Sequence, residues 1–266
     1  MSKYKLVAVD MDGTLLDDNK NISSNTINAI NAIIAKGIVF VISTGRPYAG
    51  VKKYFEMIDG SIPLILYNGA VVSFSKEDNV LYNCKLSSAS SKKIIDIINY
   101  HHGTFIFWSN EKLYINKVND YTDFYLTISN VKPVLIDENT VIPYDDITKI
   151  IWIEENEKLV DFQKNNEYDL SDVSFFTSQP IFLEFVNKGI SKAKALEAIG
   201  NYYHINASEM IAIGDGYNDL AMIEYAGLGV AMENGETGVK QKANYITSSN
   251  EDEGVLKVIN KFILND

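Results

Sequence analysis

The sequence has a single cysteine, Cys84, and only 5 prolines among its 266 residues. One cysteine cannot build an internal disulfide framework or a zinc cluster of several thiolates, and this usage is typical of a reducing compartment. No apolar run approaches the length of a membrane span, and the N-terminal residues lack the pattern of a signal peptide. We therefore expect a cytoplasmic protein that makes no membrane contact.

Basic residues are also scarce, with 24 Lys and Arg against 35 Asp and Glu, a net charge of -11 and a pI near 4.8. Proteins that bind nucleic acids need a basic surface to neutralise phosphates, so a nucleic-acid partner is excluded. An anionic small molecule would have to be held by a few precisely placed cations. The length is sufficient for one large domain or two moderate ones.

The order of the predicted elements indicates an α/β core that a second region interrupts. Ser23 or Ser24 can cap a helix that stops at Gly37, and an apolar strand follows at residues 38–43. Strand, helix and strand in this order form a βαβ unit, which implies parallel strands. A hairpin is predicted further on, with its turn around Asp78 and Asn79.

Between residues 83 and 186 the pattern changes to short, aromatic-rich strands with helices near 88–100 and 156–166. This alternation predicts an α+β insert with an antiparallel sheet. The α/β pattern returns at residue 187, with a helix at about 191–203 and the strand 210–214. The chain therefore reads as an interrupted core, residues 1–82 and 187–266, with an inserted domain.

Two acidic residues stand one residue apart where the first apolar strand ends. Residues 5–16 read KLVAVDMDGTLL, so a hydrophobic strand delivers Asp10 and Asp12 to its C-terminal end. Open α/β sheets bind ligands at this edge, and two neighbouring carboxylates repel each other unless a cation lies between them. Gly13 permits a sharp turn and Thr14 adds a hydroxyl. The segment suggests a metal-assisted nucleophilic site, with an ordinary acidic turn as the alternative.

The next strand also ends in small hydroxyl residues. Residues 41–46 read VISTGR. Thr44 can donate a hydrogen bond to a phosphate oxygen, and a turn at Gly45 brings main-chain N–H groups close to it. An ordinary loop is the alternative here, because Ser, Thr and Gly are common at strand ends.

A further acidic strand end lies near the C-terminus, where the strand MIAI is followed by GDGYND. Asp215 reaches the strand end as Asp10 does, and it can supply another hard oxygen to a shared cation. Asn218 and Asp219 open the next helix. Helix capping explains Asn218 by itself, but it does not explain a second acidic strand end in the same sheet.

Lys192 begins a predicted helix, where a lysine is poorly placed because the helix dipole is positive at the N-terminus. Ser191 is a suitable N-cap residue. A functional role would explain the lysine, and a solvated side chain is the alternative. Lys194 on the same helix is the competing candidate.

Taken together, these segments resemble the motifs of the haloacid dehalogenase-like superfamily of phosphotransferases. DMDGT at 10–14 is similar to the first motif, Thr44 to the second, Lys192 to the third and GDGYND at 214–219 to the fourth. The long insert between Thr44 and Lys192 is similar to the type IIB cap of the Cof-type branch. One departure is Ala193, which stands where the family usually has glycine after the lysine.

The resemblance implies a Rossmann-like three-layer α/β core with a parallel sheet and an α+β cap at residues 83–186. It also implies a phosphatase that hydrolyses small phosphorylated metabolites, such as sugar phosphates, with Mg²⁺ as cofactor and a phosphoaspartate intermediate. Asp10 is then the nucleophile, and Asp12 protonates the leaving oxygen and later activates water. The metal is held by the Asp10 carboxylate, the Asp12 main-chain carbonyl and Asp215, with Asp219 behind them.

The residues implied for catalysis are Asp10, Asp12, Thr44 and Lys192, and those implied for substrate binding are Thr44, Gly45, Asn68, Lys192 and Asn218. The cap is expected to select the substrate, because the core contacts are used on the phosphoryl group. Trp108, Tyr114 and Trp152 could stack on a substrate ring, although aromatic residues in short strands are usually core. Glu184, near the return to the core, is expected to line a cleft.

Other functions remain open from the sequence. A sugar phosphomutase can share this core and cap position, and it would return the phosphoryl group to the sugar. A catalytically silent regulator that binds a phosphometabolite is the alternative from another class, although both acids of the first motif and the lysine are present. A receiver domain shares the phosphorylatable aspartate but gives no reason for the insert. A monomer is the default expectation, with a weak dimer as the alternative.

Overall fold

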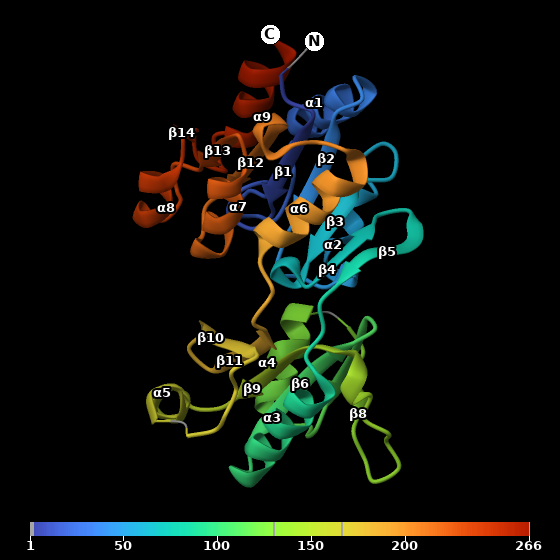
Figure 1. The fold of residues 1–266 in the computed structure, drawn as a ribbon, viewed down its shortest axis with the longest axis vertical. Coiled ribbons are helices and arrows are strands. Elements are labelled where there is room, and N and C mark those ends of the chain that lie inside the picture. Colours follow the sequence, from blue (N-terminus) through green and yellow to red (C-terminus); the bar gives the residue numbers. More distant parts are fainter. Residues whose placement is uncertain (1–2, 130, 166, 266) are drawn as a thin grey trace. The chain divides into compact units, whose positions relative to one another are not determined.

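The computed structural model describes residues 3–129, 131–165 and 167–265, and the chain divides into two compact units (Figure 1). The core unit consists of Met1–Asn83 and Ser191–Asp266, and the inserted unit of Cys84–Ile190. The junctions lie one and four residues later than the sequence pattern suggests. In the described part of the chain, no helix is both long and apolar enough to cross a membrane.

The core unit is built on one eight-stranded sheet with β1 and β2 at its centre (Figure 1). The strands from β14 to β3 are parallel, and β4 and β5 add to the edge in antiparallel orientation. Every residue of β1 is buried, as expected for a parallel strand covered on both faces. In spatial order the strands are β14 (Tyr245–Ile246), β13 (Leu228–Ala231), β12 (Met210–Gly214), β1 (Leu6–Asp10), β2 (Val39–Ser43), β3 (Pro63–Leu66), β4 (Val71–Phe74) and β5 (Glu77–Asn83).

Helices cover both faces of this sheet and complete a three-layer, Rossmann-like core. On one face, α6 (Lys192–Tyr203) and α7 (Leu220–Tyr225) pack against Leu6 and Ala8 of β1. On the other, α1 (Ser24–Ala35) contacts α9 (Gly254–Ile259). The remaining core helices are α2 (Tyr48–Phe55) and α8 (Thr237–Lys242), and a π-helical turn (Asn260–Leu264) extends α9.

The hairpin of β4 and β5 turns earlier than the sequence pattern suggests. The predicted turn at residues 78–79 lies within β5, and the chain reverses at Ser75 and Lys76. Ser75 is buried and fixed to Ile62, because its N–H donates to the Ile62 carbonyl and its Oγ accepts from the Ile62 N–H. These two bonds hold the first residue of the turn. Because residues 78–79 lie within β5, the prediction of a turn there is wrong.

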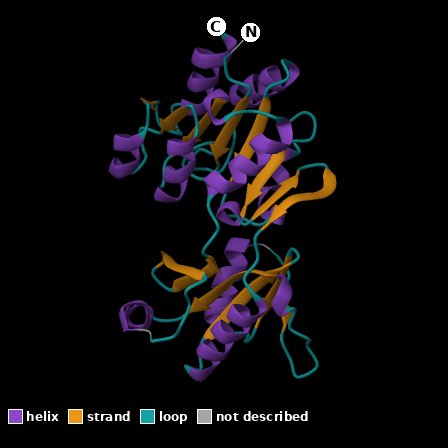
Figure 2. Cartoon of the chain, viewed as in Figure 1, coloured by secondary structure: helices purple, strands orange, loops and turns teal. Residues whose placement is uncertain are grey.

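The inserted unit is an α+β fold with a six-stranded sheet (Figure 2). Its strands are antiparallel except for β8, which pairs in parallel with β7. Residues of α3 and α5 pack together on one face of the sheet, while Tyr125 of α4 contacts Trp108 and Phe182 on the other. The strands in order are β10 (Val173–Gln179), β11 (Phe182–Asn187), β9 (Ile147–Ile153), β6 (Thr104–Ser109), β7 (Lys112–Ile115) and β8 (Val134–Leu135), and the helices are α3 (Ser88–Tyr100), α4 (Asp120–Ser129) and α5 (Asn156–Asn165).

The aromatic side chains of these strands are largely core, as favoured from the sequence. Trp108 and Trp152 are buried, and Tyr114 stacks on Phe107 with ring centroids 4.6 Å apart. Glu184 differs from the prediction that it lines a cleft. It is buried and paired with the buried Lys149, with 3.0 Å between Nζ and Oε2, because a carboxylate inside this sheet face requires a partner of opposite charge.

Candidate active site

Three parallel strands bring the predicted acidic residues to one edge of the core sheet. Asp10 is the last residue of β1 and is aligned with Ser43 at the end of β2, so Thr44 follows at the same edge. On the other side of β1, β12 ends at Gly214, immediately before Asp215. The carboxyl ends of parallel strands are where open α/β sheets bind ligands.

The turn after β1 needs a glycine for two reasons. Gly13 has φ of 81°, a left-handed conformation that side chains rarely adopt. A Cβ at this position would also lie only 2.5 Å from Oδ2 of Asp215. The next residue, Thr14, is buried, and its hydroxyl donates to Oδ1 of Asp215 at 2.8 Å. The DGT segment therefore fits closely around the Asp215 carboxylate.

Lys192 is the buried cation of the site and the first residue of α6. Its Nζ donates to Oδ1 of Asp10 at 2.5 Å and to Oδ1 of Asp219 at 2.6 Å. Ser191 caps the helix by accepting from the Lys194 N–H, while the Lys194 side chain is exposed. Two carboxylates thus compensate the unfavourable dipole at the helix N-terminus, which accounts for a lysine at this position.

Asp219 uses both carboxylate oxygens within the protein. Oδ1 accepts from Lys192, and Oδ2 accepts the main-chain N–H groups of Asp215 at 3.1 Å and of Gly216 at 3.0 Å. The residue lies in a 3-10 turn, Tyr217–Asp219, that precedes α7. A carboxylate with this set of donors positions Lys192 and the 215–216 backbone.

The site holds more acidic than basic side chains although it is largely buried. Burial raises the pKa of Asp10 well above its ordinary value; Lys192 opposes the rise and Asp219 reinforces it. Burial alone would lower the pKa of Lys192, but the Asp10 and Asp219 carboxylates outweigh burial and raise it. The pKa of Asp215 is also raised, mainly by burial. The ammonium is therefore charged, and it compensates only part of the acidic charge around it.

These residues fit a divalent metal ion. Oxygen atoms of Asp10, Asp215 and Asp219 all lie within 4.8 Å of one another. Oδ2 of Asp10 and Oδ2 of Asp215 accept no hydrogen bond from any described side chain. Three carboxylates with one lysine leave two uncompensated negative charges when all are ionised, which a hard divalent cation with oxygen ligands would balance.

The Asp12 side chain contacts Arg46 instead of the three clustered carboxylates. Arg46 binds it with two hydrogen bonds, from Nε to Oδ2 at 2.8 Å and from Nη2 to Oδ1 at 2.5 Å. Lys20 adds a longer contact of 3.2 Å to Oδ1. Burial alone would raise the pKa of Asp12, but Arg46, with help from Lys20, lowers it. Arg46 ends the segment VISTGR and was not predicted to have a role, because nothing local in the sequence indicates a partner 34 residues away.

The residues predicted to bind substrate lie on adjoining loops. Thr44 is buried; its carbonyl accepts from the Asn68 N–H at 2.9 Å and its hydroxyl from the Arg46 N–H at 3.2 Å. Asn68 has a left-handed φ of 57° within a 3-10 turn, Tyr67–Gly69, and its Oδ1 accepts from Nδ2 of Asn218 at 3.2 Å. A Cβ on Gly45 would lie 3.1 Å from Nδ2 of Asn68, so these loops are in close contact.

Comparisons with known proteins agree with this arrangement. A family model described as haloacid dehalogenase-like hydrolase matches residues 7–259. Two Bacillus subtilis proteins named 5-amino-6-(5-phospho-D-ribitylamino)uracil phosphatase are similar over 98% of this chain: YitU is 31% identical, with 98% of its length covered, and YcsE is 34% identical, with 96% covered. The crystal structure of TM0651 from Thermotoga maritima superposes with a TM-score of 0.89 and 30% identity, covering 97% of each chain. The chain belongs to the haloacid dehalogenase-like hydrolases.

Proposed function

We propose that this protein is a Mg²⁺-dependent phosphatase that hydrolyses small phosphorylated metabolites through a phosphoaspartate at Asp10. The observation that carries the proposal is the buried contact of Lys192 with Asp10 and Asp219, beside Asp215. A carboxylate is a weak nucleophile toward a phosphate dianion, because both are negative. A buried lysine next to the attacking group reduces this repulsion where water screens least.

In this proposal, Asp10 attacks phosphorus with Oδ2, the oxygen that Lys192 leaves free. The bond from phosphorus to the leaving oxygen breaks, and Asp12 gives that oxygen its proton. Asp12 then takes a proton from the water that attacks the phosphoaspartate, which restores Asp10 and releases phosphate. Mg²⁺, held by the Asp10 and Asp215 carboxylates and the Asp12 main-chain carbonyl, would supply the remaining charge neutralisation when bound.

The surrounding polar groups have distinct tasks in the same scheme. Thr44 and the main chain at Gly45 bind the phosphoryl oxygens, and Asn68 with Asn218 contacts the substrate beside them. Asp219 is a positioning residue, since it holds Lys192 and the main chain before Asn218. Asp12 must be protonated when the leaving oxygen departs and ionised when water attacks, and its lowered pKa favours the ionised form that the second of these steps requires.

The names of the two Bacillus relatives support a substrate with a phosphorylated sugar or polyol chain. We propose that this chain acts on the same broad class, in the cytoplasm and as a monomer, and that the inserted unit selects among its members. The contacts on the phosphoryl group are common to every phosphate ester, so selection within the class depends on the inserted unit.

Phosphate release from a panel of sugar, polyol, flavin and pyridoxal phosphates tests the proposed function, with p-nitrophenyl phosphate as a generic ester. We expect release from at least one sugar or polyol phosphate, loss of that activity on chelation, and recovery on restoring Mg²⁺. Isomerised sugar phosphate without free phosphate would establish a mutase instead. Tight binding of a panel member with no turnover over hours would establish a silent regulator.

Replacing Arg46 tests the role given to Asp12. Arg46 lowers the pKa of Asp12, so Arg46→Ala raises that pKa, and a base with a higher pKa is ionised only at higher pH. We expect the acid limb of the pH profile of kcat to move upward by about one pH unit, with a smaller shift in Arg46→Lys, which keeps the charge but loses the paired geometry.

The control for this experiment is Lys36→Ala, which removes an exposed charge from the same unit. Its pH profile should match the parent protein. An unchanged acid limb in Arg46→Ala, with kcat intact, would show that Asp12 does not control the step that limits turnover.

A further inference from the structure

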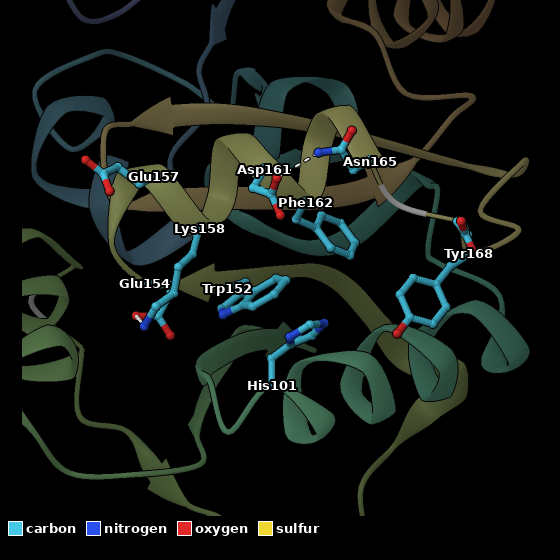
Figure 3. A pocket seen from close by; sticks show the side chains of 10 residues that line it. His101, Trp152, Glu154, Glu157, Lys158, Asp161, Phe162, Asn165 and Tyr168 are labelled. Carbon is cyan, nitrogen blue, oxygen red and sulfur yellow. Dashed lines mark hydrogen bonds and ion pairs between the residues drawn. The ribbon is translucent and has the colours of Figure 1, made fainter.

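The inserted unit contains a cavity of its own, with a volume of about 870 Å³. It is lined by α5, the C-terminal end of α3, the end of β9 and residues 167–168, and its described lining residues all belong to the inserted unit (Figure 3). Pockets that bind small molecules are commonly of this size. Of these residues, Trp152 was a candidate from the sequence for stacking on a substrate ring, and the proposed chemistry uses none of the others.

Aromatic rings make up part of the cavity lining. Figure 3 shows Trp152, His101, Phe162 and Tyr168 grouped around it. The ring centroids of His101 and Trp152 are 5.3 Å apart, those of Trp152 and Phe162 are 5.1 Å apart, and Phe162 stacks with Tyr168 at 6.2 Å. Trp152 and Phe162 are buried, while His101 and Tyr168 are exposed. The group therefore offers an apolar surface, and an accessible ring such as Tyr168 can attract an organic cation through its negative face.

Carboxylates also line the cavity, and most of them form no ion pair with a described lysine, arginine or histidine. Glu157, Asp161 and Glu167 line the cavity, and no lysine, arginine or histidine among the described residues forms an ion pair with them. Among the described lining residues the lysine is Lys158, which pairs with Glu154 at 3.3 Å and with Glu155 at 3.7 Å. The cavity therefore carries excess negative charge as well as aromatic rings.

We propose that this cavity binds a small organic cation, an ammonium group carried on an aromatic or aliphatic body. The carboxylates would attract the ammonium, and the rings would cover its apolar part and contribute cation–π attraction. The same charge would repel a phosphate ester, so this ligand is chemically distinct from the proposed substrate. The proposal needs no phosphatase activity and is tested by binding alone.

The test is calorimetric titration of the full-length protein with 2-phenylethylammonium chloride, compared with 2-phenylethanol and phenylacetate. These probes share the ring and differ in charge. We expect saturable binding of the ammonium compound, at least about tenfold weaker binding of the alcohol, and no binding of phenylacetate up to about 10 mM. Equal affinity for the ammonium compound and the alcohol, or no binding of the ammonium compound, would overturn the proposal.

Charge-removing variants locate the binding. Glu157→Gln combined with Asp161→Asn should weaken binding of the ammonium probe about fivefold or more, as two partly exposed ion pairs would. Asp123→Asn with Glu138→Gln is the matched control, because it removes two exposed carboxylates of the same unit that do not line the cavity. Equal weakening by both pairs would show a general charge effect and contradict the proposed site. Thermal midpoints of all variants check their folding.

Discussion

An Asp10→Asn variant is expected to lose at least about 1000-fold in kcat for phosphate release, because it removes the attacking carboxylate itself. The side chain is nearly isosteric, so the loss would not come from packing in this buried site. Lys192 keeps its contact with Asp219, and the remaining charges are balanced more closely than before. The measurement is the steady-state release of phosphate from the best ester of the panel, at saturating Mg²⁺.

Two further measurements separate a nucleophile from a residue that merely supports the site. Acid quenching during turnover followed by borohydride reduction should convert phosphorylated Asp10 to homoserine, which mass spectrometry of the peptide detects. Asp59→Asn, an exposed acid in the same unit, should leave both kcat and the homoserine signal unchanged. Substantial activity in Asp10→Asn, or homoserine at another aspartate, would make the assignment wrong.

Lys192→Met is expected to affect both activity and stability. The variant loses the cation beside the attacking oxygen, which should lower kcat by about 100-fold to 1000-fold. It also leaves the buried Asp10 and Asp219 carboxylates uncompensated, a change that typically costs about 3–5 kcal/mol of unfolding free energy. Burial raises the pKa of Asp10 in the folded protein above that in the unfolded chain. The metal-free variant should therefore lose stability as the pH rises above the ordinary pKa of an aspartate.

Lys194→Met is the matched control, because it removes an exposed lysine from the same helix turn. Its kcat and its denaturation midpoint should stay close to the parent values. A double variant, Lys192→Met with Asp219→Asn, should regain part of the lost stability and none of the activity. Full stability of metal-free Lys192→Met would contradict the prediction that the buried ion pairs of Lys192 stabilise the fold.

Much of the fold could be predicted from local sequence patterns, because many helices and strands are indicated by the residues of a single segment. The buried strand β12 (Met210–Gly214) and helix α3 (Ser88–Tyr100) match the expected ranges, and Ser191 caps α6 as anticipated. The helices α2 and α4 were not predicted. Helix α2 (Tyr48–Phe55) is only eight residues long, has no side-chain cap and carries a glycine, so its formation depends on packing.

The site shows the same division between local signals and long-range contacts. Asp10 and Asp215 lie close together because their two strands end at the same edge of the sheet. A sequence pattern can indicate such strand ends. The partners of each carboxylate depend on contacts between distant segments, as with Arg46 and Asp12. The cavity in the inserted unit is of this kind too, because α3, β9 and α5 each supply part of it.

Asp219 allows no close substitute. One oxygen faces an ammonium group and the other faces two main-chain N–H groups, so the position must accept hydrogen bonds on both sides. An asparagine of the same size could turn its amide either way, yet its NH₂ would always face another donor. Glutamate has the same two carboxylate oxygens, but its side chain is one methylene longer and would need extra space at this buried position. Aspartate is the side chain that is both short enough and free of donors.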